Sequence, residues 1–126
     1  MKPMRLSLAV VAVVAMLAAC GSPPASPGTV DPADADVTIT SVDMAFDQTT
    51  VTVPAGEAFT LALVNQDSMQ HNVAIYTDSS ASEDLFVGEF IGEGTIVYDV
   101  PALEPGEYFF RCDLHPDMVG TLIVEG

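Results

Sequence analysis

From residue 37 to the C-terminus, apolar and β-branched residues alternate with polar ones in short runs that turn residues separate. Alternation with a period of two is typical of half-buried strands. The turns include Pro54-Ala55-Gly56-Glu57 and Glu104-Pro105-Gly106. The expected strands cover residues 37–40, 50–53, 58–64, 72–76, 86–91, 95–100, 107–111 and 120–124.

This strand content decides the fold class, because no segment shows a sustained helical stripe. Seven to eight short strands within residues 37–126 predict an all-β domain, an antiparallel β-sandwich. A chain of 126 residues has room for one such domain and hardly for two. We expect Met44 to lie in the core, where methionine fills irregular gaps.

The N-terminus has the composition of a processed leader. Lys2 and Arg5 precede residues 6–19, which are apolar except for one serine. This stretch is shorter than the roughly 20 residues that a membrane-spanning helix needs, so residues 1–19 are interpreted as a signal peptide. The sequence Leu17-Ala18-Ala19-Cys20 resembles a bacterial lipobox, which implies cleavage before Cys20 and acylation of its thiol. The alternative is ordinary cleavage that leaves Cys20 unmodified.

Residues 20–36 read as a tether between this anchor and the folded domain, residues 37–126. The tether is rich in proline and aspartate and has almost no apolar content, so it cannot build a core. A lipid on Cys20 predicts an extracytoplasmic protein anchored to the cell membrane, on its periplasmic or cell-surface side.

Charge restricts the partners of the mature chain. Removing Lys2 and Arg5 changes the formal net charge from −15 to −17 and leaves Arg111 as the only basic residue. Phosphates would be repelled, so nucleic acid is excluded as a partner. The acidic surface favours either steering toward a basic docking face or plain solubility, and the sequence leaves both open.

The residues with metal-binding chemistry fall in two short segments. The chain has two histidines, His71 and His115, and outside the proposed anchor one cysteine, Cys112. In Cys112-Asp113-Leu114-His115-Pro116-Asp117-Met118 each candidate ligand follows the last by three residues, so one compact loop can direct all three inward. Two imidazoles, a thiolate and a weak axial thioether form the ligand set of blue-copper electron-transfer sites. We therefore expect copper on His71, Cys112, His115 and Met118.

Other interpretations of these residues explain less. Structural zinc sites prefer four cysteine or histidine ligands, and a thioether is a poor ligand for zinc. A Cys–His nucleophile pair would leave Met118 and the second histidine without a role. A disulfide between Cys20 and Cys112 would join a tether to a strand end, and lipidation would forbid it.

Residues 106–121, from Gly106 to Thr121, resemble the ligand loop of plastocyanin/azurin-type cupredoxins, and the spacing is similar to that of amicyanins. Upstream, Met44-Ala45-Phe46, Val53-Pro54-Ala55-Gly56 and His71-Asn72-Val73 also resemble the family. The resemblance implies a Greek-key sandwich with copper near one end and with His115 as the ligand at the solvent edge.

The resemblance also implies roles for the neighbours of the ligands. The N–H of Asn72 would reach the Cys112 sulfur while its side chain ties the loops together. Amicyanin loops commonly carry proline between Cys and His, whereas this chain has Asp113-Leu114, so the N–H of Leu114 is free to donate to the thiolate. Met69 is expected on the surface or at the rim of the site.

Together these residues predict a monomeric type 1 copper protein that carries one electron between Cu(I) and Cu(II), and not an enzyme. Its partners would be redox proteins such as a cytochrome or an oxidase. The alternative is a copper chaperone or storage protein that delivers metal to an oxidase. A chaperone calls for exchangeable, often methionine-rich ligands, and one thiolate with two histidines argues against it.

Overall fold

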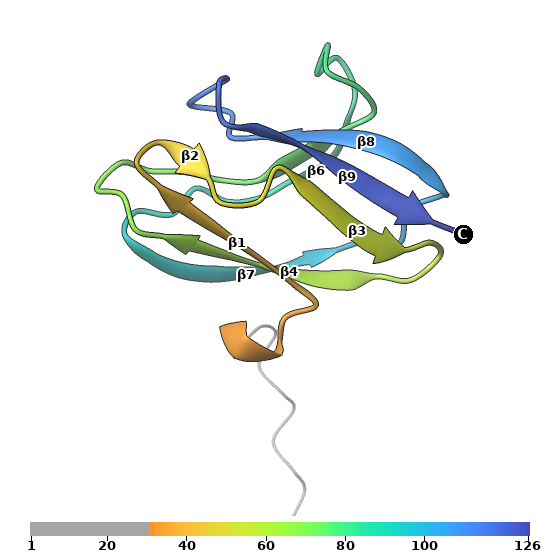
Figure 1. Cartoon of the computed structure of the whole chain (residues 1–126), viewed down its shortest axis with the longest axis horizontal. Coiled ribbons are helices and arrows are strands. Elements are labelled where there is room, and N and C mark those ends of the chain that lie inside the picture. The colour runs from red at the N-terminus through yellow and green to blue at the C-terminus, as the bar shows by residue number, and fades with distance from the viewer. Residues whose placement is uncertain (1–30) are drawn as a thin grey trace, which may run out of the picture.

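Two β-sheets pack face to face in the computed structural model, which describes residues 31–126 (Figure 1). One sheet has the strand order β2-β1-β4-β7, and the other has the order β3-β9-β8-β5-β6. The chain crosses repeatedly from one sheet to the other, so strands that are distant in sequence become neighbours. The expected all-β sandwich is confirmed.

The described residues form nine strands and one short 3-10 helix, η1. Their bounds are η1 Pro32–Asp34, β1 Val37–Val42, β2 Ala45–Phe46, β3 Thr50–Pro54, β4 Phe59–Asn65, β5 Ala74–Tyr76, β6 Asp84–Val87, β7 Gly94–Val100, β8 Gly106–Arg111 and β9 Val119–Glu125. The ninth strand, which the sequence did not predict, is the two-residue β2.

Strand direction departs from the antiparallel expectation. β1 pairs with β4 in parallel, and β3 pairs with β9 in parallel, while the other pairs are antiparallel. Period-two alternation is the same for both directions, so the sequence pattern could not distinguish them.

The strand expected over residues 86–91 was wrong in its bounds. β6 ends at Val87, and Gly88 then passes close to the other sheet, where a Cβ would lie 2.7 Å from the Tyr98 ring. The Gly88 N–H donates to the Val73 carbonyl, and Ile91 exchanges both backbone bonds with His71 in an isolated bridge. The chain therefore leaves the edge of one sheet here, and this crossing fixes the backbone on which His71 lies.

The core lies between the sheets and follows the alternation of the strands. In β3 the burial pattern alternates strictly, and Val51 and Val53 are buried. β4 is buried at almost every position, as a central strand should be. Each fully buried aliphatic or aromatic side chain stabilises the fold by about 1.5–3 kcal/mol relative to exposure.

Met44 does not lie in this core, contrary to expectation. It is 43% exposed and adopts a left-handed backbone conformation in the turn between β1 and β2. This turn and the loop between β8 and β9 lie at the same end of the sandwich, away from the C-terminus (Figure 1). The short β1–β2 hairpin, invisible in the alternation pattern, explains the error.

The described chain enters the sandwich at residues 31–36. The Asp36 carboxylate accepts hydrogen bonds from the backbone and the hydroxyl of Thr60, which hold the pKa of Asp36 below its ordinary value. The signal peptide, Cys20 and residues 20–30 of the expected tether lie outside the described residues. Within residues 31–126, no helix is long and apolar enough to cross a membrane.

Candidate metal centre

Cys112 follows β8 directly and begins a tight loop that ends at Met118, just before β9. Three backbone bonds close this loop: the N–H of Cys112 donates to the Met118 carbonyl, that of His115 to Cys112, and that of Met118 to His115. The loop thereby turns both the Cys112 and the Met118 side chains into the buried core. Cys112 is fully buried and forms no disulfide among the described residues.

The structure brings three of the predicted ligands together. His71 Nδ1 and His115 Nδ1 lie 3.0 Å apart, and the Cys112 sulfur lies 3.7 Å from the first and 3.6 Å from the second. These residues come from two segments that are 41 positions apart in sequence. Among the described residues, His71, Cys112 and His115 form a group whose ligand atoms all lie within 4.8 Å of one another, close enough to hold one metal ion.

The spacing of these atoms fits one metal ion. The centre of the circle through the three atoms is about 2 Å from each of them, the length of a metal–imidazole bond and close to that of a metal–thiolate bond. A thiolate and two imidazoles are soft and borderline ligands of the kind that copper prefers. The donor set therefore fits copper.

Met118 is buried beside this cluster, with 2% of its surface exposed. It belongs to the same core cluster as Cys112 and, with His115, lines a hollow of about 240 Å³ at the surface. Its place at the end of the ligand loop suits an axial thioether, and that role stays a prediction.

His71 is held by a carboxylate that the sequence analysis did not identify. Its Nε2–H donates to Asp67 Oδ2 at 2.9 Å, and Asp67 also accepts the N–H groups of Asp43 and Met44. Because a carboxylate only accepts, the shared proton resides on Nε2 and leaves Nδ1 free for the metal.

Asn65, at the end of β4, fixes the rest of this segment. Its side-chain amide donates to the carbonyls of Met69 and Ile91, and its oxygen accepts from the Ser41 hydroxyl and the Asp67 N–H. Asn65 is buried, and in this buried position all its hydrogen-bonding groups are used. The backbone that presents His71 is therefore braced from two directions.

Asn72 links the two ligand segments through its side chain. Its oxygen accepts the N–H of Asp113 at 2.9 Å, and its amide donates to the Gly88 carbonyl. The bonds expected from the N–H groups of Asn72 and Leu114 to the Cys112 sulfur stay predictions. The link nevertheless fixes the backbone next to Cys112 against the backbone next to His71.

Asp113 is the centre of a small polar cluster beside the site. It accepts from the Tyr76 hydroxyl at 2.6 Å and from Arg111 Nε at 3.0 Å, and the guanidinium stacks 5.0 Å from the Tyr76 ring centre. Desolvation opposes ionisation of Asp113, but the hydrogen bonds of Tyr76, Arg111 and Asn72 hold its pKa below the ordinary value. Desolvation, with Asp113 nearby, raises the pKa of Tyr76. Arg111, the only lysine or arginine among residues 31–126, is thus engaged in this cluster.

Exposed apolar side chains surround His115. Leu114 is 53% exposed, and Met69 and Met44 are exposed on either side of it. Leu114 and His115 line two adjoining hollows, one shared with Met69 and the other with Met44. The prediction that Met69 lies at the rim agrees with this placement.

Asp67 was missed because the sequence offers little to single it out. It is one of 18 acidic residues and lies in a loop where aspartate is common. The one usable signal was its position four residues before His71, with Asn65 two residues earlier. That signal becomes informative only once His71 is taken as a ligand.

Comparison with known proteins assigns the family. Residues 8–124 match the model of the cupredoxin-like domain. The chain belongs to the cupredoxin-like family. The resemblance of residues 106–121 to cupredoxin ligand loops is thereby confirmed at the level of the family.

Amicyanin from Paracoccus versutus is 40% identical over 75 residues, which are 60% of this chain and 54% of that protein. The match thus spans about half the length of this relative. The match to the crystal structure of the same amicyanin covers 75% of this chain and 84% of the amicyanin chain, with a TM-score of 0.58 and 38% identity.

More distant structures support the fold alone. The match to reduced auracyanin from Roseiflexus castenholzii covers 71% of this chain and 96% of the auracyanin chain, with a TM-score of 0.63 and 21% identity. The match to an amicyanin variant in its Cu(I) form covers 75% of this chain and 87% of the variant's chain, with a TM-score of 0.59 and 23% identity.

Proposed function

We propose that this cupredoxin is a type 1 copper electron-transfer protein, with His71, Cys112 and His115 as the equatorial ligands and Met118 as the axial one. The observation that carries the proposal is the meeting of one thiolate and two imidazole nitrogens around a point about 2 Å from each. When bound there, copper supplies a one-electron couple between Cu(I) and Cu(II).

The protein's part is to hold the ligands still and to exclude water. Cys112 and His71 are both fully buried, and bonds from Asp67, Asn65 and Asn72 fix the backbone around them. Ligands that barely move between two oxidation states keep the cost of electron transfer low. A buried sulfur is also protected from oxidation by solvent species.

Electrons would enter and leave through His115. This imidazole is partly exposed, whereas His71 and Cys112 have no solvent contact. Leu114, Met69 and Met44 form an apolar rim around it that a redox partner could cover. A cytochrome or an oxidase that places its own cofactor against this rim would be within short range of the metal.

Spectroelectrochemistry of the copper-loaded protein tests this function against delivery of copper. An electron carrier keeps its copper through repeated oxidation and reduction, so an intense visible thiolate band should disappear and return without loss in the presence of a Cu(I) chelator. Transfer of the metal to the chelator on each reduction would instead support a chaperone or store.

We also propose that Cys20 carries a lipid that anchors the protein outside the cytoplasmic membrane. The support is the apolar leader that stops at Leu17-Ala18-Ala19-Cys20. Cys20→Ser should yield unprocessed or released protein, whereas wild-type protein should stay with membranes in high salt and leave them only in detergent. Release of wild-type protein by salt alone would contradict the anchor.

A further inference from the structure

Asp67 contacts the proposed site without being one of its ligands. Among residues 31–126 it is the carboxylate that bonds a ligand imidazole, through His71 Nε2 at 2.9 Å. Its side chain is 14% exposed, so the charge lies largely out of water. The contact thus joins the carboxylate of Asp67 to the buried imidazole of His71.

The turn between β1 and β2 keeps Asp67 in this place. Asp67 Oδ1 accepts the Asp43 N–H at 2.8 Å, and Oδ2 accepts the Met44 N–H at 3.2 Å. Both turn residues have positive φ, 54° and 61°, a conformation that methionine rarely adopts. The turn thereby points two successive N–H groups at one carboxylate and prevents Asp67 from rotating away from His71.

A carboxylate in this position has two physical effects on the ligand. It fixes the tautomer with the proton on Nε2, so that Nδ1 faces Cys112 and His115. It also makes the imidazole a stronger donor, and the negative charge favours the more positive oxidation state of a nearby ion. The stronger donation and the negative charge both stabilise Cu(II) over Cu(I).

We propose that Asp67 is a positioning residue that orients His71 and lowers the reduction potential of the site. The proposal rests on the proposed copper function and adds to it a residue outside the ligand set. The proposal also explains the left-handed turn at Asp43–Met44, because the N–H groups of this turn hold the Asp67 carboxylate against the His71 ring.

The test compares Asp67→Asn with Asp43→Asn in the copper-loaded full chain. Asparagine keeps the size of the side chain and one acceptor but removes the charge. Asp43→Asn removes the same charge from the adjoining turn, where the side chain is exposed and asparagine suits a positive φ. The potential should rise in both variants and clearly more in Asp67→Asn.

A second readout follows the shared proton by NMR in the diamagnetic Cu(I) protein. The His71 Nε2–H resonance should lie far downfield and exchange slowly with solvent in wild type. It should move upfield and exchange faster in Asp67→Asn but stay unchanged in Asp43→Asn. A merely structural role for Asp67 would not produce this difference.

Equal shifts in potential for the two variants, with an unchanged His71 proton, would overturn the proposal. If Asp67→Asn does not fold, rapid exchange of the His71 Nε2–H in wild type, as fast as that of His115, would overturn it instead. Absence of the visible band in wild type would refute the copper function itself, so the two failures are distinguishable.

Discussion

The two segments that carry the metal ligands are built in opposite ways. Around His71, side-chain bonds from Asp67 and Asn65 and a two-way backbone bridge to Ile91 brace the chain. The loop from Cys112 to Met118 is closed mainly by its own backbone bonds, and Leu114 projects into solvent. In the proposed function, one segment would fix the position of the metal, and the other would expose a ligand to partners.

The comparison explains how a site can be rigid and still exchange electrons. In the proposed site, the buried side would keep the ligand geometry constant between oxidation states. The loop side brings one imidazole to the surface without opening the rest of the site to water. Five experiments test this division of roles, from the largest expected effect to the smallest.

Cys112→Ser should abolish the visible band completely. Cys112 is the only cysteine among residues 31–126, and its sulfur faces both imidazoles. The measurement is the absorption spectrum of the variant with one equivalent of Cu(II). A fully retained band would show that the thiolate assignment is wrong for both segments.

Replacing each histidine by glycine should separate the two sides. In His115→Gly, added imidazole should restore most of the band, because the position adjoins surface hollows. In His71→Gly it should restore little, because His71 is fully buried. Titration of both variants with imidazole measures the difference, and equal rescue would contradict the comparison.

Gly120→Ala should destabilise the base of the ligand loop. A Cβ at Gly120 would overlap the ring of Phe110, which pairs with Gly120 across β8 and β9. Overpacking of this kind typically costs about 1–3 kcal/mol in the free energy of unfolding. Gly92→Ala is the control, since its Cβ would meet nothing within 4 Å. Urea denaturation of both variants should show a loss for Gly120→Ala only.

Met118→Leu should keep the visible band and raise the reduction potential. Leucine fills a similar volume in the buried position of Met118 but cannot donate electron density to the metal. Voltammetry of the copper-loaded variant measures the shift. An unchanged potential would remove Met118 from the ligand set and leave it a core residue.

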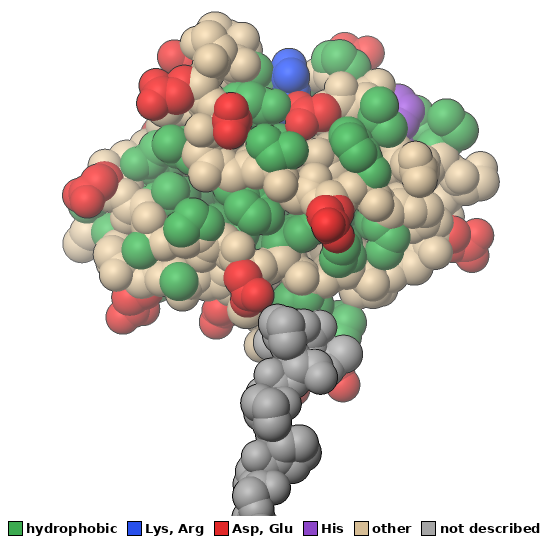
Figure 2. Space-filling model, turned by 180° about the vertical axis from the view of Figure 1, so that it is seen from behind, with side chains coloured by type: hydrophobic (Ala, Val, Ile, Leu, Met, Phe, Trp, Pro, Cys, Tyr) green, Lys and Arg blue, Asp and Glu red, His purple; other side chains and the backbone are tan. Residues whose placement is uncertain are grey.

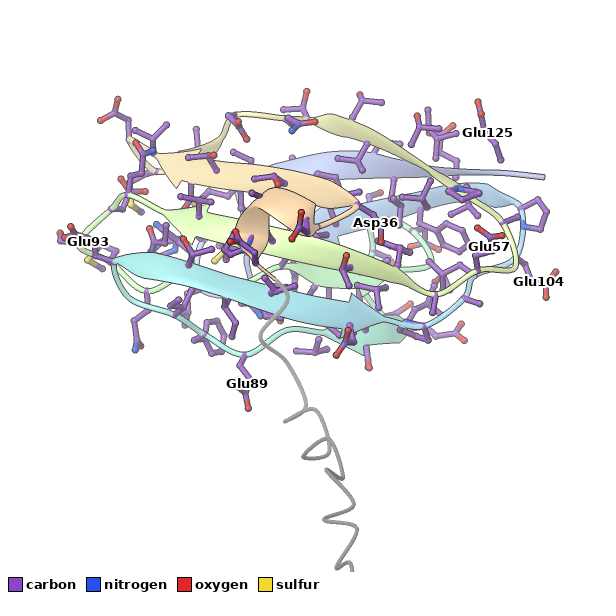
Figure 3. All side chains as sticks on the ribbon, turned by 90° about the horizontal axis from the view of Figure 1, so that it is seen from below. Asp36, Glu57, Glu89, Glu93, Glu104 and Glu125 are labelled. Atoms are coloured by element: carbon purple, nitrogen blue, oxygen red, sulfur yellow. The ribbon has the colours of Figure 1, made fainter. Side chains whose placement is uncertain are left out.

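The smallest effect concerns how a partner approaches. If charge steers docking, electron exchange with a basic cytochrome should slow as salt rises, because exposed charges are screened over about 8 Å at physiological ionic strength. Acidic residues lie at both ends of the molecule: Glu57, Glu104 and Glu125 are at the opposite end from Glu93 (Figure 3). Acidic side chains are also spread over the face seen in Figure 2.

The alternative is docking through the apolar rim around His115. In that case salt should change the rate little, and Leu114→Asp should reduce it sharply. Asp117→Asn, a change at another exposed position of the same loop, is the control for a general effect of charge. A rate that is independent of salt would eliminate charge steering.

Much of this molecule could be predicted from particular residues. Alternation in Val51–Val53 and the apolar run Leu61–Val64 of β4 predict the sandwich. The spacing of Cys112, His115 and Met118 gives the loop that carries the ligands. These features are local, so short stretches of sequence determine them.

The features that could not be predicted depend on contacts between distant segments. The parallel pairing of β1 with β4 leaves no mark on either strand. The bond between Asp67 and His71 requires the turn at Met44 to fold over it, and that turn breaks the usual preference for glycine or asparagine at positive φ. Met44 was predicted in the core because methionine commonly fills irregular gaps there.

X-ray absorption at the copper edge, in both oxidation states, tests the central claim most directly. The account predicts two nitrogen ligands and one sulfur ligand at about 2 Å, with only small changes on reduction. A copper ion that lacks the short sulfur ligand, or whose ligands are replaced on reduction, would contradict it.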